Sequence, residues 1–304
     1  MITRELFHFS LPQIRESGQC FRMERLPGDT ETDTIVSGGR FLAIRQDGTR
    51  VTFYCDERDL PYWESYLDLD TDYGAIIQSV DPDDAYLQAA ARAGSGIRIL
   101  RQDPWEMILT FLISQQKTIP AIRSLVGALC IRYGEKRPVP ADIAASVPGV
   151  PAYYYTFPTP KELSAASLDD LLAMKLGYRA KYIRRTVEAA LGGELDLAAL
   201  SRMKYGEAME YLKSFYGIGE KVANCICLFG LHQIDAFPVD TWIQKILLRE
   251  YAPKSRLTAD VPKSRLCGAL VSEFFSAYRG FAGVMQQYIF YYERNYRNET
   301  QKRP

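Results

Sequence analysis

The hydrophobic pattern of this chain changes its period near residue 100, and that change constrains the fold more than any other feature. Before it, the segments FLAIRQ (41–46) and VTFYCD (51–56) are rich in β-branched and aromatic residues. The Asp-Gly pair that lies between them is typical of a tight hairpin turn. We therefore expect an antiparallel sheet over residues 1–60, followed by helices over residues 61–92.

Beyond residue 100 the apolar residues recur at helical spacing. DPWEMILTFLISQQ (103–116) has a Pro near its start, and PAIRSLVGALCIRYG (120–134) continues the pattern and ends at Gly. The pattern predicts further helices over residues 139–146, 160–165, 168–175, 179–192, 196–200, 205–215, 219–231, 240–251, 261–273 and 280–296. The expected fold class is α+β, with an N-terminal antiparallel β-sheet domain containing a few helices over residues 1–100 and an all-helical domain over residues 101–304.

The net charge of the chain hides an uneven distribution. Its 304 residues include 37 basic and 37 acidic side chains, so that it is formally neutral. Residues 1–100 carry a balance of −7, whereas residues 101–304 carry +7. A basic region beside an acidic one indicates binding to a polyanion, against the alternative that the division is incidental.

The sequence also predicts the surroundings in which the protein works. No apolar run approaches the roughly 18–20 residues that span a bilayer, and the polar start MITRELFHFS does not resemble a signal peptide. We therefore expect no membrane partner. The six cysteines include no Cys-x-x-Cys pair, which argues against a zinc ribbon and a cubane iron–sulfur cluster and favours reduced thiols. The expected localisation is cytoplasmic, or nucleoid-associated in a prokaryote.

Histidine chemistry is equally restricted. The chain contains only His8 and His232, and they lie in different parts of the sequence. A zinc site with several histidines is therefore not available. Neither histidine lies in a recognisable nucleophile context, so a Ser-His-Asp triad is not indicated.

The segment LKSFYGIGEKVANCICLFG (212–230) is the most informative one. An amphipathic helix ends at its first aromatic pair, Gly217 and Gly219 turn the chain, and a second helix starts at once. Two glycines permit close approach of the backbone, and the free N–H groups of the second helix complete a cradle for one phosphate. We interpret residues 205–231 as a helix-hairpin-helix, which binds the nucleic-acid backbone; the alternative is an ordinary helical corner.

Lys221 lies in the first turn of the second helix, where the positive end of the helix dipole disfavours a cation. The same field together with partial burial would provide a neutral amine, which can attack a sugar C1′ or a carbonyl. The alternative is a solvated lysine that contacts phosphate. Nineteen residues later, Asp240 stands at the natural N-cap of the helix TWIQKILLRE. It can cap that helix and also hold a nucleophilic lysine.

Four ordered motifs make the sequence resemble the 8-oxoguanine DNA glycosylase family of the helix-hairpin-helix DNA glycosylase superfamily. ESGQCFRM (16–23) is similar to that family's SGQ-x-FRW segment, and DPWEMILTFLISQQKTIPAIR (103–123) to its DP-x-E…SFI helix with the following loop. LGYRAKYI (176–183) is similar to its GLGYRA-x-Y motif, and KVANCICLFGL (221–231) to its KVADCICL helix. The downstream Pro-Val-Asp also matches.

The resemblance implies a bifunctional DNA glycosylase and AP lyase that flips and excises 8-oxoguanine from duplex DNA. Lys221 would attack C1′ and form a Schiff base, and β-elimination would then cleave the strand 3′ to the abasic site, with Asp240 as the catalytic carboxylate. Gly18 would accept the N7–H of the oxidised base through its carbonyl, Cys225 would line the base pocket, and Gln286 or Gln287 would recognise the base. A glycine that serves only a bend and a cysteine buried in the core are the alternatives.

The resemblance also implies residues that handle the duplex after base flipping. Tyr178 and Arg179 match positions that wedge the stack and contact the orphaned cytosine, and Gln116 falls where the family has an asparagine with the same task. The family's next cytosine-contacting arginine falls at Ala121 here, with Arg123 two residues on, so that strict selection for cytosine is in doubt. The alternatives are packing for Tyr178 and a polar helix end for Gln116.

Further expectations concern ligands, partners and competing functions. Gly217, Gly219 and Val222 would bind phosphate through the hairpin backbone, which is also able to hold a structural Na⁺ or K⁺; no cofactor and no catalytic metal is required. The expected partner is double-stranded DNA containing oxidised guanine, bound by a monomer. The alternatives are a glycosylase for another purine lesion, which Lys221 argues against, a non-catalytic helix-hairpin-helix DNA-binding protein, and a helical protein unrelated to DNA.

Overall fold

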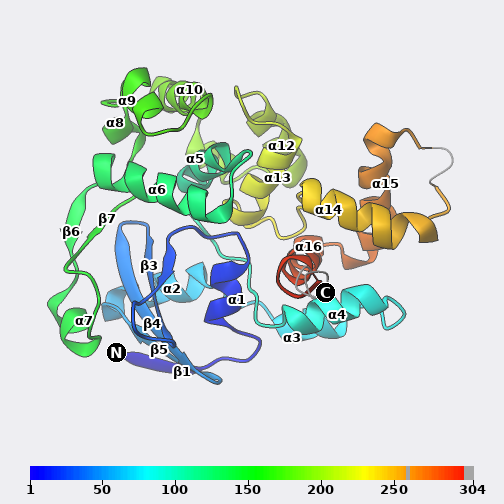
Figure 1. Cartoon of the computed structure of the whole chain (residues 1–304), viewed down its shortest axis with the longest axis horizontal. Helices are drawn as coiled ribbons and strands as arrows, with labels where there is room; N and C mark the ends of the chain where they lie inside the picture. Colours follow the sequence, from blue (N-terminus) through cyan, green and yellow to red (C-terminus); the bar gives the residue numbers. More distant parts are fainter. Residues whose placement is uncertain (258–260, 298–304) are drawn as a thin grey trace, which may run out of the picture.

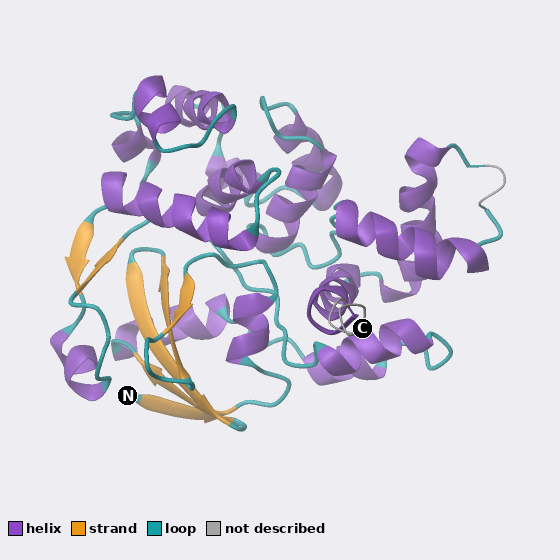
Figure 2. Cartoon of the chain, viewed as in Figure 1, coloured by secondary structure: helices purple, strands orange, loops and turns teal. Residues whose placement is uncertain are grey.

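The computed structural model describes residues 1–257 and 261–297, and its strands gather in one part of the molecule, apart from most of the helices (Figures 1 and 2). Five strands form an antiparallel sheet in the order β1-β5-β4-β3-β2. Their bounds are β1 Ile2–Glu5, β2 Met23–Arg25, β3 Thr32–Ser37, β4 Arg40–Asp47 and β5 Arg50–Tyr54. The expected Asp-Gly turn joins β4 to β5, where Asp47 pairs with Arg50 and Gly48 has φ +59°. The N-terminal antiparallel sheet is therefore confirmed.

A short helix that the sequence pattern did not predict packs on this sheet. Helix α1 (Leu11–Glu16) begins at Ser10, whose hydroxyl accepts the N–H of Gln13. Leu11 and Ile14 are fully buried in the core that includes the sheet residue Leu42. Six residues are too few to show helical periodicity, and tertiary burial stabilises such a helix.

The region between the sheet and residue 100 contains three helices, α2 Leu60–Tyr66, α3 Tyr73–Gln78 and α4 Ala85–Ala93. Helix α4 packs against the C-terminal helix α16 (Ala282–Tyr292), as Figure 1 shows. The buried residues Leu87 and Tyr288 accordingly share one core cluster, which continues through the helical part. The domain boundary at residue 100 stays a prediction.

The rest of the chain is predominantly helical, as expected. The helices are α5 Pro104–Ser114, α6 Ile119–Tyr133, α7 Ala141–Ser146, α8 Pro160–Leu163, α9 Leu168–Ala173, α10 Arg179–Gly192, α11 Leu197–Leu200, α12 Tyr205–Lys213, α13 Glu220–Phe229, α14 Thr241–Ile246, α15 Lys263–Phe275 and α16. A π-helical turn, Leu247–Tyr251, extends α14. None of the helices in the described part of the chain is both long and apolar enough to cross a bilayer.

One small sheet in the second part of the chain was not predicted. Strands β6 (Lys136–Pro138) and β7 (Tyr153–Tyr155) pair antiparallel, with α7 between them in the chain. Arg137 and Tyr154 both donate hydrogen bonds to the carbonyl of Gly39, in the turn between β3 and β4 of the N-terminal sheet, at 2.9 and 3.0 Å. Three-residue strands carry no readable alternation, and these contacts with the N-terminal sheet explain why they form. The second part is therefore helical with one small added sheet.

A buried ion pair joins the sheet to α5. The Glu106 carboxylate lies 3.5 Å from Arg22 Nη1, and both side chains are more than nine-tenths buried. Burial raises the pKa of Glu106 to about 7, against the attraction of the Arg22 guanidinium, which lowers it. Asp103 caps the same helix by accepting the N–H of Glu106 at 2.9 Å.

The raised pKa of Glu106 predicts a specific dependence of stability on pH. Its pKa is 4.5 as a free group and about 7 in the folded chain, so the folded chain binds more protons between these values. This contribution is complete below pH 4.5 and is lost as the pH rises through 7. We expect the free energy of unfolding to fall from pH 5 to pH 8 by about 1–3 kcal/mol more in the wild type than in Glu106→Gln, measured by urea denaturation. Equal decreases in the two proteins would contradict this assignment.

Candidate active site

A small pocket of about 50 Å³ brings together residues from five separate segments of the chain. The loop after α1, helix α5, helix α13, the start of α14 and helix α16 each contribute to its wall. Six of the residues singled out from the sequence line it: Gly18, Lys221, Cys225, Asp240, Gln286 and Gln287. The remaining lining residues are Ser17, Phe111, Phe229, Pro238 and Phe290.

Lys221 is half-buried in the first turn of α13, two residues after the N-cap Gly219. Its Nζ atom lies 5.3 Å from the centre of the Phe111 ring, and that ring stacks on Phe229 at 5.6 Å. Burial raises the pKa of the Cys225 thiol, one turn further along, while the charge of Lys221 and its hydrogen bond to the thiol oppose that rise. The amine therefore lies inside the pocket, against an aromatic face and a sulfur atom.

Asp240 caps α14 and faces the same pocket. Its Oδ1 atom accepts the backbone N–H groups of Trp242 at 3.0 Å and Ile243 at 2.8 Å. Its Oδ2 atom accepts no hydrogen bond from the described residues. The capping interaction thus fixes the direction of the carboxylate and leaves one oxygen for another partner.

Two adjacent glutamines of α16 line the pocket, and both are 4% exposed. Gln286 Nε2 donates to the carbonyl of Pro238 at 3.1 Å, and Gln287 Nε2 donates to Gln286 Oε1 at 2.9 Å. Gln287 Oε1 is buried and accepts no hydrogen bond from the described residues. The pair therefore presents an unsatisfied acceptor of the kind that a buried ligand N–H can satisfy.

Gly18 requires glycine because of its conformation and its neighbours. Its φ of +82° disfavours any side chain. A Cβ atom there would lie 3.2 Å from the Phe290 ring and 3.4 Å from Ile119. The backbone of the loop after α1 therefore approaches α16 closely at the pocket.

The two glycines of the hairpin have different structural surroundings. Gly217 has φ +94°, and a Cβ atom there would lie 2.5 Å from the Tyr182 ring, so its role includes packing. Gly219 has φ −95°, and a Cβ atom would meet nothing within 4 Å, so the space beside it is open. The Val222 side chain is buried, but its N–H lies in the first turn of α13, where no intrahelical acceptor exists.

The residues expected to handle the duplex lie on two turns outside the pocket. Tyr178, at the start of α10, is 43% exposed. Gln116 is exposed with φ +53°, because α5 ends at Ser114, two residues earlier than expected. Arg179, in contrast, is only 5% exposed, and its guanidinium donates to the carbonyl of Gln115. Its side chain is turned toward the protein in this structure.

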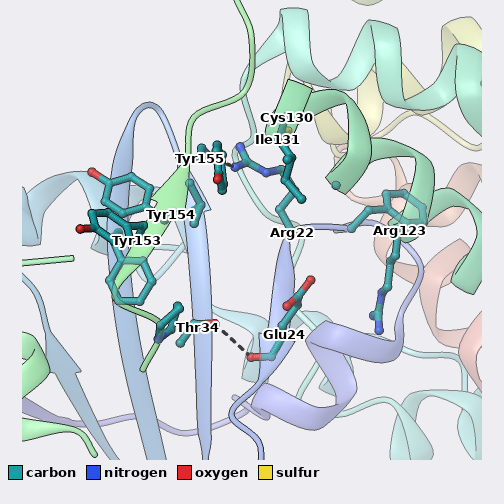
Figure 3. A pocket seen from close by; sticks show the side chains of 14 residues that line it. Arg22, Glu24, Thr34, Arg123, Cys130, Ile131, Tyr153, Tyr154 and Tyr155 are labelled. Atoms are coloured by element: carbon teal, nitrogen blue, oxygen red, sulfur yellow. Dashed lines mark hydrogen bonds between the residues drawn. The ribbon is translucent and has the colours of Figure 1, made fainter. Parts of the chain in front are cut away.

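A larger cavity of about 190 Å³ lies elsewhere, between the N-terminal sheet, α6 and β7 (Figure 3). The Arg22 guanidinium there donates to the Tyr155 carbonyl, and the Thr34 hydroxyl donates to the Glu24 carbonyl, as Figure 3 shows. Lys221 and Asp240 are not among its lining residues. We place the chemistry in the smaller pocket because the amine, the carboxylate and the unsatisfied amide oxygen meet there.

Sequence reasoning did not assign the three aromatic residues of the pocket, Phe111, Phe229 and Phe290. Phe290 follows Gln286 by four residues, so that both share one face of α16. That spacing could have assigned it to the pocket. Within residues 1–257 and 261–297, no three His, Cys, Asp or Glu side chains gather in a way that could hold a metal ion.

Comparison with known proteins gives consistent matches along the chain. The family model described as "8-oxoguanine DNA glycosylase, N-terminal domain" matches residues 1–108, and that described as "HhH-GPD superfamily base excision DNA repair protein" matches residues 109–266. The N-glycosylase/DNA lyase of Saccharomyces cerevisiae is 33% identical over 267 residues, which cover 79% of this chain and 68% of the yeast protein. The N-glycosylase/DNA lyase OGG1 of Arabidopsis thaliana is 29% identical over 294 residues, covering 92% of this chain and 76% of the plant protein.

Similarity to solved structures extends over nearly the whole chain. The 8-oxoguanine glycosylase/lyase of Clostridium acetobutylicum, in complex with dsDNA containing cytosine opposite to 8-oxoG, superposes with a TM-score of 0.84 at 32% identity. The superposition covers 97% of this chain and 94% of the clostridial one. Sequence and fold thus point to the same group of relatives.

The hairpin predicts a contrast between two glycine substitutions. Gly217→Ala combines a strained φ with a clash against Tyr182, so we expect it to lower the free energy of unfolding by about 2 kcal/mol or more. Gly219→Ala meets no neighbour and costs at most about 1 kcal/mol as an N-cap, but its methyl group occupies the open side where a phosphate would approach. Urea denaturation and DNA-binding titrations of both variants test this. Tight DNA binding by Gly219→Ala would argue against the phosphate cradle.

Proposed function

The chain belongs to the 8-oxoguanine DNA glycosylase family, and from this we infer that it excises 8-oxoguanine from duplex DNA and cleaves the strand at the resulting abasic site. It is a DNA N-glycosylase with AP lyase activity, and DNA is its partner. The assignment to particular residues rests on one observation. The amine of Lys221 and the carboxylate of Asp240, each from the start of a helix, line the same pocket.

We propose that Lys221 is the nucleophile. Its position against the Phe111 ring, in the pocket that Asp240 also lines, brings the amine to the place where a flipped nucleotide would enter. The amine lone pair forms a bond to C1′ of the flipped nucleotide, and the bond from C1′ to the base nitrogen breaks with its electron pair leaving on the base. Loss of the amine proton and opening of the sugar ring give the imine, from which removal of a C2′ proton expels the 3′ phosphate.

We propose that Asp240 stabilises the positive charge that develops on the sugar and accepts a proton in these steps. Its Oδ1 atom is held by two backbone N–H groups, and the residue lines the pocket. A charge fixed in this way needs no reorganisation during the reaction. The helix cap and the catalytic role are thus two uses of one carboxylate.

Base recognition rests on the other wall of the pocket. The carbonyl of Gly18 is proposed to accept N7–H, the proton that distinguishes 8-oxoguanine from guanine, and Cys225 to line the face of the flipped base. Gln287 Oε1, the unsatisfied acceptor, suits an N–H on the Watson–Crick edge of the base, while Gln286 holds the amide of Gln287 in place.

Selection of the opposite base is proposed to be relaxed. Ala121 lacks a polar side chain, and Arg123 Nη2 donates to the carbonyl of Arg15 at 2.7 Å instead of facing the duplex. Gln116 is exposed and carries the remaining amide on that turn. One amide selects cytosine less strictly than an amide together with an arginine.

The proposed enzyme needs no cofactor. A structural Na⁺ or K⁺ on the carbonyls of the hairpin Gly217–Gly219 is compatible with this loop and would not enter the chemistry. Each enzyme acts on one lesion, so that we propose a monomer that works in the compartment holding the DNA and needs no membrane.

The first experiment traps the imine. Incubation with a duplex containing 8-oxoguanine opposite cytosine, followed by borohydride, is expected to give a covalent protein–DNA adduct. Lys221→Gln removes the amine and should abolish both the adduct and strand cleavage, while urea denaturation checks that the variant is folded. Intact DNA binding by the wild type without any adduct would instead favour a non-catalytic DNA-binding protein.

The second experiment separates the two uses of Asp240. Asn is as good an N-cap as Asp, so Asp240→Asn should keep the free energy of unfolding within about 1 kcal/mol of the wild type. Its single-turnover excision rate should fall by about 100-fold or more, because the charge is lost. Asp240→Ala should lose stability as well as rate. A wild-type excision rate in Asp240→Asn would show that the residue acts only as a helix cap.

A further inference from the structure

One side of α10 carries a line of basic and aromatic side chains that continues beyond the expected wedge residue. This line, called here the α10 stripe, consists of Tyr178, Lys181, Tyr182 and Arg185. Positions three and four residues apart lie on the same side of a helix, so the four side chains follow one another along its axis. Both basic members of the stripe are exposed. The helix therefore presents two positive charges along one line of its surface.

The acidic side chains nearest to the stripe in sequence and at the hairpin are paired with other cations. Glu188 of α10 pairs with Arg184 at 2.7 Å. Glu220, at the start of α13, pairs with Lys213 at 3.3 Å. Within residues 1–257 and 261–297, the two basic side chains of the stripe make no hydrogen bond and no ion pair. The stripe is thus a cationic surface that the described part of the chain does not neutralise.

Arg185 is stacked on an aromatic residue that belongs to the hairpin. Its guanidinium carbon lies 4.1 Å from the centre of the Tyr216 ring. Tyr216 is 51% exposed, so the pair lies at the surface of the protein. Stacking uses a face of the guanidinium and leaves its N–H donors, which point outward in the plane, free. This is the arrangement in which an arginine binds a phosphate through two parallel N–H groups.

A series of ring contacts places this pair between two expected DNA contacts, the wedge and the hairpin. The Tyr178 ring meets the Tyr182 ring edge to face, with centres 5.5 Å apart. Tyr182 meets Tyr216 in the same way at 5.1 Å. Tyr216 directly precedes Gly217, the first glycine of the hairpin. Arg185 therefore lies on the hairpin side of the series, beside the place proposed for the bound phosphate.

We propose that Arg185, stacked on Tyr216, binds a backbone phosphate of the duplex next to the one that the hairpin binds. The phosphate oxygens accept N–H groups from the edge of the guanidinium, and the Tyr216 ring keeps the guanidinium plane in place. Phosphates follow one another about every 3.4 Å along the axis of a strand, so a bound phosphate always has close neighbours. A contact of this kind adds affinity without reading the base. This inference rests on the proposed function, because it takes the hairpin to bind DNA.

The primary test measures how DNA binding by the full chain depends on salt. Two duplexes are compared, one with a single 8-oxoguanine and one of the same sequence with guanine. In Arg185→Gln the slope of log K against log salt should become smaller by about one, because one phosphate contact is lost. The Kd at low salt should rise by about 3-fold or more, and by the same factor for both duplexes. Arg185→Lys keeps the charge and should keep the slope.

Arg92→Gln is the matched control, because it removes the same charge from a different part of the surface. Arg92 is exposed on α4, where its side chain donates to Gln88 of the same helix at 3.5 Å. Figure 1 shows α4 and α10 at opposite sides of the molecule. The control should therefore have the Kd and the salt slope of the wild type. Urea denaturation checks that each variant is folded.

A second set of variants tests the stacking of Arg185 on Tyr216. Tyr216→Phe keeps an aromatic face, so it should bind both duplexes more tightly than Tyr216→Leu. The weakening caused by Tyr216→Leu should nearly disappear in the Arg185→Gln background, because the ring acts through the guanidinium. If Arg185→Gln did not fold, tighter binding by Tyr216→Phe than by Tyr216→Leu would still support the proposal, and equal binding by the two would overturn it.

Three results would overturn the inference for folded variants. They are an unchanged salt slope in Arg185→Gln, an equal decrease of the slope in Arg92→Gln, and weaker binding of Arg185→Gln to the 8-oxoguanine duplex alone. Failure of the proposed function has a different signature. A wild type that excises nothing, but loses one unit of salt slope on Arg185→Gln, would contradict the enzymatic activity and leave the phosphate contact supported.

Discussion

The packing of α5 on α13 is the interaction on which the candidate site depends. Phe111 of α5 stacks on Phe229 of α13, with ring planes 16° apart, and the amine of Lys221 lies 5.3 Å from the centre of the same Phe111 ring. A lysine in the first turn of a helix gains nothing from the helix dipole. The Phe111 ring of α5 offsets this unfavourable placement, because an aromatic face attracts the ammonium group.

The opposite wall of the pocket includes the start of a second helix, α14. The cap of α14 aims the Asp240 carboxylate, and α16 closes the pocket with an amide pair whose outer oxygen is unsatisfied. Each of these features costs stability or leaves a polar group without a partner, and all of them converge on about 50 Å³. A group of unsatisfied polar atoms in one pocket is typical of a ligand-binding site and not of a hydrophobic core.

Local signals in the sequence predicted the elements that have strong local causes. The bounds of α10, 179–192, agree with the structure, and Lys221 and Asp240 could be chosen because their positions at helix starts are readable from spacing alone. Helix α1 and the β6–β7 pair were missed because tertiary contacts, and not periodicity, stabilise them. The burial of Arg179 was also beyond the sequence, since its acceptor lies 64 residues away on another turn.

We expect Lys221, and no other amine of the chain, to form the covalent bond to the sugar. The most direct measurement is peptide mapping by mass spectrometry of the borohydride-reduced protein–DNA complex after nuclease and protease digestion. The sugar remnant is expected on Lys221, in the peptide from the start of α13. Attachment to any other lysine, or to the N-terminal amine, would contradict it.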